Sequence, residues 1–149
     1  MPVRAAGFSL IELLVVLVLL ALASTAVVLN LPAPDPLREP AQRLAARLQH
    51  AQSLAVIGNR PLRLQLDTQG YVFQQREQGQ WLPAGQPALA AQAWPAATTV
   101  RFNGQPARVL NLAIDASGGG HSGTLDLHNG PHHWQLQLHD DGRIDAQPR

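Results

Sequence analysis

The sequence of 149 residues contains no cysteine and no lysine. Without cysteine, disulfides, thiol chemistry and cysteine-based zinc sites are excluded, while the redox compartment stays open. The eleven basic residues are therefore all arginines, and ten acidic residues oppose them. This balance provides no excess positive charge of the kind that would indicate nucleic acid as the main partner.

One long apolar run, residues 8–31, stands out in a chain that is otherwise of mixed polarity, and its only full charge is Glu12. At about 1.5 Å rise per residue the run would reach roughly 36 Å as a helix, enough to cross a hydrocarbon core of about 30 Å. A carboxylate at the centre of such a segment costs roughly 2.5–3.5 kcal/mol. Glu12 lies only about 6 Å of helix from Phe8, which reduces this cost without removing it. An acidic residue retained there indicates a function.

The start of this run resembles the class III signal of type IV pilins and type II secretion pseudopilins: Gly7, then Phe8, then Glu12 at the fifth position from Phe8, then an unbroken apolar helix. The resemblance implies that prepilin peptidase removes the leader, residues 1–7, between Gly7 and Phe8 and methylates the new amino group of Phe8. It also implies that residues 8–31 remain as a transmembrane and assembly helix. Glu12 would pair with the amino-terminal charge of a neighbouring subunit, which would offset the penalty of an ionised carboxylate.

Two other interpretations of the apolar run remain open. A cleaved secretory signal also has a basic start, an apolar core and a small-x-small cleavage site, which Ala21-Leu22-Ala23 before Ser24 would provide. The second interpretation is that the run is a simple single-pass membrane anchor. Glu12 lies inside the apolar core that a secretory signal would need, and the run continues beyond Ser24. Both features favour the prepilin-type signal, and a simple anchor leaves Glu12 unexplained.

The position of Arg4 indicates the orientation of the segment, because the positive-inside rule places the short basic end in the cytoplasm. We therefore expect a single-pass protein of the bacterial inner membrane with its C-terminal domain in the periplasm. The proline-rich residues 32–36 cannot continue a regular helix and predict an extended joint. Residues 37–149 have the size of one domain.

An amphipathic helix is predicted from Pro40 to about Gly58. Asp35 before Pro36 could cap it, with Pro40 as an alternative start. Gly58-Asn59 and Pro61 predict its end. Apolar residues recur at spacings of three and four on one stripe, namely Leu37, Ala41, Leu44, Leu48, Ala51 and Ala55. We expect the stripe to pack on a sheet, with a groove for a partner helix as the alternative. The arginines of this segment are expected on its solvated face.

After Pro61 the sequence predicts antiparallel strands. Alternating apolar residues and turn signals mark the runs 62–66, 71–73, 81–82, 100–102, 110–114, 125–127, 134–138 and 144 onward, with turns at 67–70, 103–104, 129–131 and 141–142. The stretch from Pro83 to Pro95 shows no periodicity and is predicted to be a surface loop. One helix followed by a series of strands indicates an α+β fold.

This second part resembles the H-type minor pseudopilins of type II secretion (the GspH/FimT family) and the related FimU-type minor pilins. The resemblance rests on the segments 54–61, 64–71, 114–118, 123–125 and 142–144 and on Trp81. It implies a structural subunit of a periplasmic pseudopilus that helps drive export of folded proteins across the outer membrane. Its implied partners are other minor and major pseudopilins, prepilin peptidase and the inner-membrane assembly platform. The alternative is a minor type IV pilin that acts in pilus assembly or DNA uptake. The segment 139–145 carries three acidic residues and one arginine, which argues against a DNA-binding tail.

Neither an enzyme nor a metalloprotein is expected. Ser122 with His121 and Asp115 supplies the residue types of a hydrolase, but the segment lacks the five-residue spacing of a nucleophile elbow and is not followed by a helix pattern. His128 and His133 flank a turn and could approach each other across a hairpin, which leaves a surface metal site as a minor alternative to exposed histidines. We therefore predict no catalytic residue, no cofactor and no metal.

Overall fold

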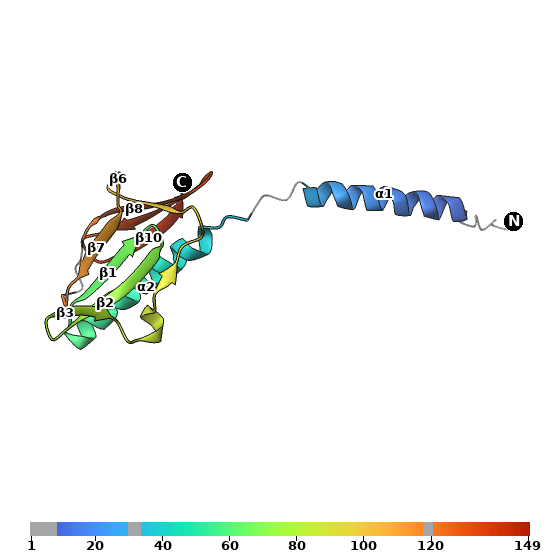
Figure 1. The fold of residues 1–149 in the computed structure, drawn as a ribbon. Helices are drawn as coiled ribbons and strands as arrows, with labels where there is room; N and C mark the ends of the chain where they lie inside the picture. Colours follow the sequence, from blue (N-terminus) through green and yellow to red (C-terminus); the bar gives the residue numbers. More distant parts are fainter. Residues whose placement is uncertain (1–8, 30–33, 118–120) are drawn as a thin grey trace. The chain divides into compact units, whose positions relative to one another are not determined.

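The computed structural model describes residues 9–29, 34–117 and 121–149. It contains two compact units, residues 1–34 and residues 35–149. The first unit carries a single helix, α1 (Leu10–Leu29), and the second carries helix α2 and ten strands or bridges among its described residues (Figure 1). The predicted cleavage pair Gly7 and Phe8, and Pro32 of the predicted joint, lie outside the described residues.

Helix α2 spans Arg38–Gly58 and therefore starts two residues before the predicted Pro40. Asp35 explains this earlier start, because its carboxylate Oδ1 accepts a 2.9 Å hydrogen bond from the backbone N–H of Leu37. The helix is capped at its C-terminal end by Asn59, which adopts a left-handed conformation with φ of 46°. The predicted apolar stripe is confirmed, since all of its residues and Ala45 are buried.

The first sheet contains β1 (Leu62–Asp67), β2 (Gly70–Glu77), β3 (Gln80–Pro83), β4 (Gln92–Ala93) and β7 (Val109–Ile114). Its order is β3-β2-β1-β7, and β4 pairs with the beginning of β2. Every pairing is antiparallel. Strand β7 is thus the neighbour of β1, although the chain passes through five other strands, β2 to β6, before reaching it.

The second sheet contains β5 (Thr99–Phe102), β6 (Gln105–Pro106), β8 (Gly123–Asn129), β9 (His132–Leu138) and β10 (Ile144–Pro148). Its order is β10-β9-β8-β5-β6, again antiparallel throughout. The predicted Asn103-Gly104 turn joins β5 to β6, with positive φ at both residues (49° and 76°). The α+β prediction is confirmed.

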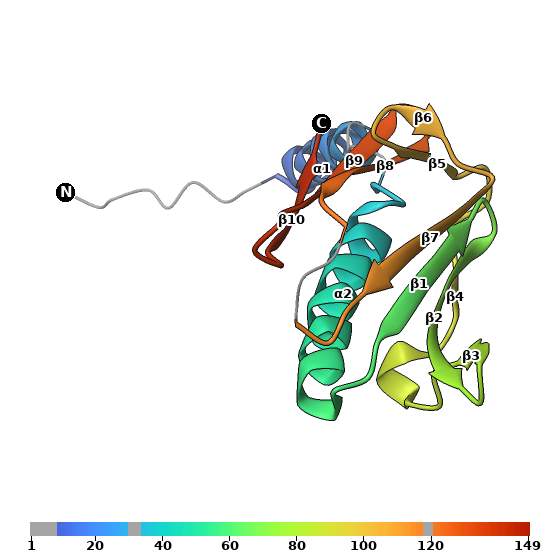
Figure 2. The same cartoon turned by 90° about the vertical axis from the view of Figure 1, so that its left-hand side faces the viewer.

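Helix α2 packs against both sheets, alongside β1 and β7 of the first and β9 and β10 of the second (Figure 2). One apolar core lies between them, and its largest fully buried side chains include Phe73, Leu44, Leu64, Leu125 and Leu136. Alternation along the strands explains this arrangement, because residues two positions apart point to the same face. The polar residues between them face away from the core.

The segment between Pro83 and Pro95 differs from the predicted surface loop. It forms a short 3-10 turn, η1 (Pro87–Leu89), and the two residues of β4. Leu89 is fully buried, and Trp94 is 7 % exposed and donates its indole N–H to the backbone oxygen of Asp67 at 2.8 Å. These contacts bridge residues distant in sequence, so no local periodicity could indicate them.

Candidate functional site

Helix α1 carries the predicted assembly residue Glu12 in its first turn. A carboxylate at this end of a helix interacts favourably with the partial positive charge of the helix N-terminus. The apolar side chains that follow are uncovered in the single chain: Leu10, Ile11, Leu13, Leu14, Leu17, Leu19, Leu20 and Leu22 are each more than half exposed. Apolar residues occur on every side of the helix, a pattern typical of a helix that is covered all round. Within the described part of the chain, no helix is both long and apolar enough to span a membrane.

Asp35, the first residue of the second unit, is held by strand β9. Its Oδ2 accepts a 2.6 Å hydrogen bond from the indole Nε1–H of Trp134, and its Oδ1 lies 3.5 Å from Nδ1 of His132. Burial tends to raise the pKa of Asp35, but the hydrogen bonds from Trp134 and Leu37 and the nearby His132 hold it below its ordinary value. Asp35, near the end of the proline-rich joint, is therefore fixed to the sheet as well as to the start of α2.

The sequence indicated Asp35 only as a possible helix cap. Its pairing with Trp134 joins residues 99 positions apart, and an isolated aspartate and an isolated tryptophan carry no signal of such a contact. A buried indole N–H usually finds an acceptor, so a general rule predicts a partner for Trp134 without indicating which residue it is.

His128 and His133 do approach each other across the β8–β9 hairpin, as predicted. They are directly opposite in the register, and their rings stack with centroids 4.0 Å apart. Nε2 of His133 lies 3.0 Å from Oδ1 of Asp126, a carboxylate that is almost fully buried. Desolvation and the neighbouring His133 lower the pKa of His128. No group of three or more His, Asp or Glu among the described residues is arranged to hold a metal ion.

The residues considered for hydrolysis do not form a nucleophile elbow. The carboxylate of Asp115 accepts hydrogen bonds from the backbone N–H of Ser117, at 2.8 Å, and from its hydroxyl. His121 and Ser122 are exposed and directly precede strand β8, so a strand follows Ser122 where an elbow requires a helix.

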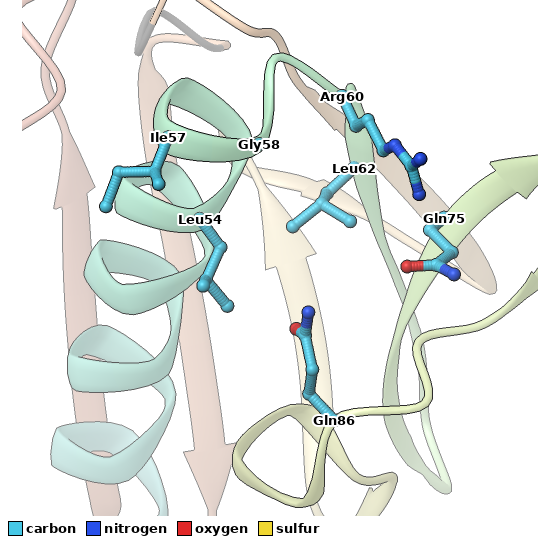
Figure 3. Close-up of a pocket in the computed structure, with 7 residues that line it drawn as sticks. All are labelled: Leu54, Ile57, Gly58, Arg60, Leu62, Gln75 and Gln86. Atoms are coloured by element: carbon cyan, nitrogen blue, oxygen red, sulfur yellow. The ribbon is translucent and has the colours of Figure 1, made fainter.

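A pocket of about 390 Å³ lies beside the C-terminal end of α2 (Figure 3). Leu54 and Leu62 face its interior, with Arg60, Gln75 and Gln86 around them. These residues provide no nucleophile and no carboxylate or imidazole for proton transfer. Ile57, which also lines the pocket, is 83 % exposed, so the C-terminal end of α2 presents an apolar side chain to the solvent.

The fold of the second unit is shared with two kinds of solved structure. The minor pseudopilin EpsH from the type 2 secretion system of Vibrio cholerae superposes with a TM-score of 0.65 at 18% identity, covering 76% of this chain and 98% of that one. The type IV minor pilin FimU of Pseudomonas aeruginosa superposes with a TM-score of 0.57 at 22% identity. This match covers 75% of this chain and 88% of FimU. Residues 3–28 match the prokaryotic N-terminal methylation motif. Together these findings define a pilin-like protein: an α+β domain behind a methylation motif.

The family follows from the domain sequence. Residues 40–142 match the family of the type II transport protein GspH, and the chain belongs to that family. The type II secretion system protein H of Aeromonas hydrophila is 34% identical over 121 residues, which cover 77% of this chain and 60% of that protein. The aligned part thus spans less than two thirds of this curated relative. The resemblance stated from the sequence is confirmed.

Proposed function

We propose that this chain is a minor pseudopilin of a type II secretion pseudopilus and helps drive the export of folded proteins across the outer membrane. One observation carries the proposal: a methylation motif over residues 3–28 precedes a GspH domain over residues 40–142 in a single chain. The role is structural, since the family is one of pseudopilin subunits. Its partners would be other minor and major pseudopilins, prepilin peptidase and the inner-membrane assembly platform.

The assembly chemistry lies in the first segment. Prepilin peptidase would cleave between Gly7 and Phe8 and methylate Phe8, and the apolar residues 8–31 would anchor the chain in the inner membrane before it enters the fibre. This run extends beyond both ends of the described helix α1. Glu12 would then pair with the methylated amino group of a neighbouring subunit. The exposed leucines of α1 support this role, because exposed apolar surface of that extent is covered by lipid or by another protein.

The topology follows from the same segment. Arg4 would remain on the cytoplasmic side with the leader, and the domain would lie in the periplasm. Residues 32–36 would join the membrane helix to the domain, with Asp35 held by Trp134 at the end of the joint.

The test is complementation of a host strain from which the gene has been deleted. The intact chain should restore secretion of the type II substrates into the medium. Glu12→Ala should be cleaved normally, because Glu12 lies beyond the cleavage point, yet should restore less than about a tenth of secretion, because the unpaired amino group would oppose packing of the helices. Normal secretion in the deletion strain, with loss of pilus function instead, would contradict the proposal.

The alternative is a minor type IV pilin involved in pilus assembly or DNA uptake, which the similarity to the FimU fold supports. The segment 139–145 weighs against DNA contact. Its arginine, Arg143, donates a 2.7 Å hydrogen bond to Asp141, and His139 lies 2.9 Å from Asp145. These pairs reduce the positive charge that phosphate contacts need. Tight, salt-sensitive retention of the purified chain on immobilised DNA would favour the alternative.

A further inference from the structure

The four edges of the two sheets differ in how they are protected against pairing with another chain. Proteins commonly block such edges with very short strands, with charged side chains or with proline. Strand β6 has two residues and contains Pro106, β3 has four and contains Pro83, and β10 contains Asp145 and Pro148. Each of these three edges therefore carries at least one blocking feature.

Strand β7 has none of them. Its six residues, Val-Leu-Asn-Leu-Ala-Ile, include no charge and no proline, and charged residues occur only at its flanks, at Arg108 and Asp115. It pairs with β1 along its whole length and has no second strand partner within residues 9–29, 34–117 and 121–149. Among the described residues, no backbone or side-chain hydrogen bond reaches the other edge of β7. Half of its backbone groups are thus available to a further strand.

The side chains of β7 define the chemistry of the strand that would fit. Leu112 and Ile114 are buried towards the core, and Leu110 is half-buried beside them. Val109, Asn111 and Ala113 are exposed on the opposite face, where none of them presents a charge. A strand added here would continue both faces. It would need apolar residues at every second position and uncharged residues between them.

We propose that the free edge of β7 receives an extended, uncharged segment of a different subunit of the same fibre, which adds to the first sheet as a further strand. Main-chain hydrogen bonds would provide the attraction, and the alternating side chains would set the register, as in other cases of strand addition. The inference rests on the proposed function, because it takes its partner from the pseudopilus. It assigns to β7 a contact between domains that is separate from the packing of the N-terminal helices.

The absence of native cysteine makes a direct test possible, because one introduced cysteine is the only thiol of the chain. Asn111→Cys places it on the exposed face of β7. Gln147→Cys is the matched control, since Gln147 is also an exposed amide residue on an edge strand, the blocked β10. Each full-length variant is produced in the host, labelled in the periplasm with a maleimide benzophenone and irradiated. The cross-linked peptides are then identified by mass spectrometry.

The proposal predicts that position 111 links to one alternating apolar segment of a different pseudopilin, at a yield at least about fivefold above that of position 147. Linkage to a second copy of this chain would overturn it in favour of self-association through β7. Equal yields at the two positions, or no product at position 111, would also overturn it.

A second pair of variants tests the consequence for assembly. Asn111→Lys adds a charge to β7, opposite the neutral Gln65, whereas Asn111→Gln keeps the amide and Gln147→Lys adds the same charge on β10. Asn111→Lys should reduce co-purification with the other pseudopilins by about fivefold or more, and both controls should remain within about twofold of the unmodified chain. Thermal unfolding and cleavage before Phe8 are measured for each variant.

These readouts separate the two proposals. If Asn111→Lys is folded, cleaved and assembled as well as the unmodified chain, the β7 proposal fails while the pseudopilin function stands. If the unmodified chain does not co-purify with pseudopilins at all, the proposed function fails. Should Asn111→Lys unfold, the cross-linking at position 111 alone decides.

Discussion

The indole N–H of Trp134 on strand β9 donates a 2.6 Å hydrogen bond to Oδ2 of Asp35, at the point where the chain enters its second unit. Trp134 is itself 4 % exposed, so its N–H has little access to water as an alternative acceptor. The contact fixes the end of the proline-rich joint to the sheet.

Removing the Asp35 carboxylate should destabilise the domain. Asp35→Ala leaves the Trp134 N–H without its acceptor and removes the cap on Leu37, and we expect a loss of about 2 kcal/mol in the free energy of unfolding. A double-mutant cycle with Trp134→Phe, measured by urea denaturation of the full chain in detergent, should give a coupling of about 1.5 kcal/mol. A coupling near zero would mean that the hydrogen bond does not contribute to stability.

The same contact should make the domain sensitive to acid. The pKa of Asp35 is lowered in the folded chain, so its ionised form contributes stability above the unfolded value of about 4, and this contribution is lost as the pH falls towards the folded value. The melting temperature should therefore decrease below about pH 4, and less steeply in Asp35→Asn. Some slope should remain in that variant, because a hydrogen bond from Arg143 also lowers the pKa of Asp141. Identical slopes for the variant and the unmodified chain would contradict this assignment.

His128 should produce a second pH dependence nearer neutrality. Its folded pKa is lowered by desolvation and by His133, against the opposing effect of Asp126, while Arg101 adds to the lowering. Folding thus favours the neutral ring, and this stability is complete above the unfolded pKa of about 6.5 and declines as the pH falls below it. In His128→Gln the melting temperature should depend less on pH between about pH 6.5 and 5. A steeper dependence of the melting temperature on pH in the variant would contradict a lowered pKa of His128 in the folded chain.

Tyr71 offers a test of a buried polar group. Its ring packs against Trp94 and Phe73, with centroids 5.0 and 6.0 Å away, but its hydroxyl is buried without a hydrogen-bond partner among the described residues. Tyr71→Phe keeps the ring contacts and removes an unsatisfied group, so stability should be unchanged or increase by up to about 1 kcal/mol. A loss of more than about 1 kcal/mol in chemical denaturation would indicate that the hydroxyl has a partner, for which the neighbouring Arg47 is the candidate.

Local patterns predicted the elements of the domain well. The stripe from Leu37 to Ala55 has the period of a helix, and the Asn103-Gly104 and Asp141-Gly142 turns favour the backbone that short hairpins need. These signals depend on neighbours in sequence, so they can be recognised without the fold. The start of α2 was displaced because Asp35 binds Leu37 ahead of the predicted Pro40.

Long-range contacts could not be predicted in the same way. Nothing in the sequence of β7 indicates that it pairs with β1, or that β5 lies beside β8. Leu89 and Trp94 are buried by residues far from them in sequence, so the aperiodic pattern of their segment predicts a surface loop instead. The Gly7-Phe8 and Glu12 roles came from resemblance to a motif, and they stay predictions because they concern processing and a second subunit.

The most direct test of the pseudopilin proposal is the N-terminal residue of the mature protein, determined by mass spectrometry of membrane extracts from the host. The proposal predicts an N-methylated Phe8, with residues 1–7 absent and Glu12 retained. A mature chain that starts at Ser24 would lack the methylated terminus and most of helix α1, and it would contradict assembly through that helix.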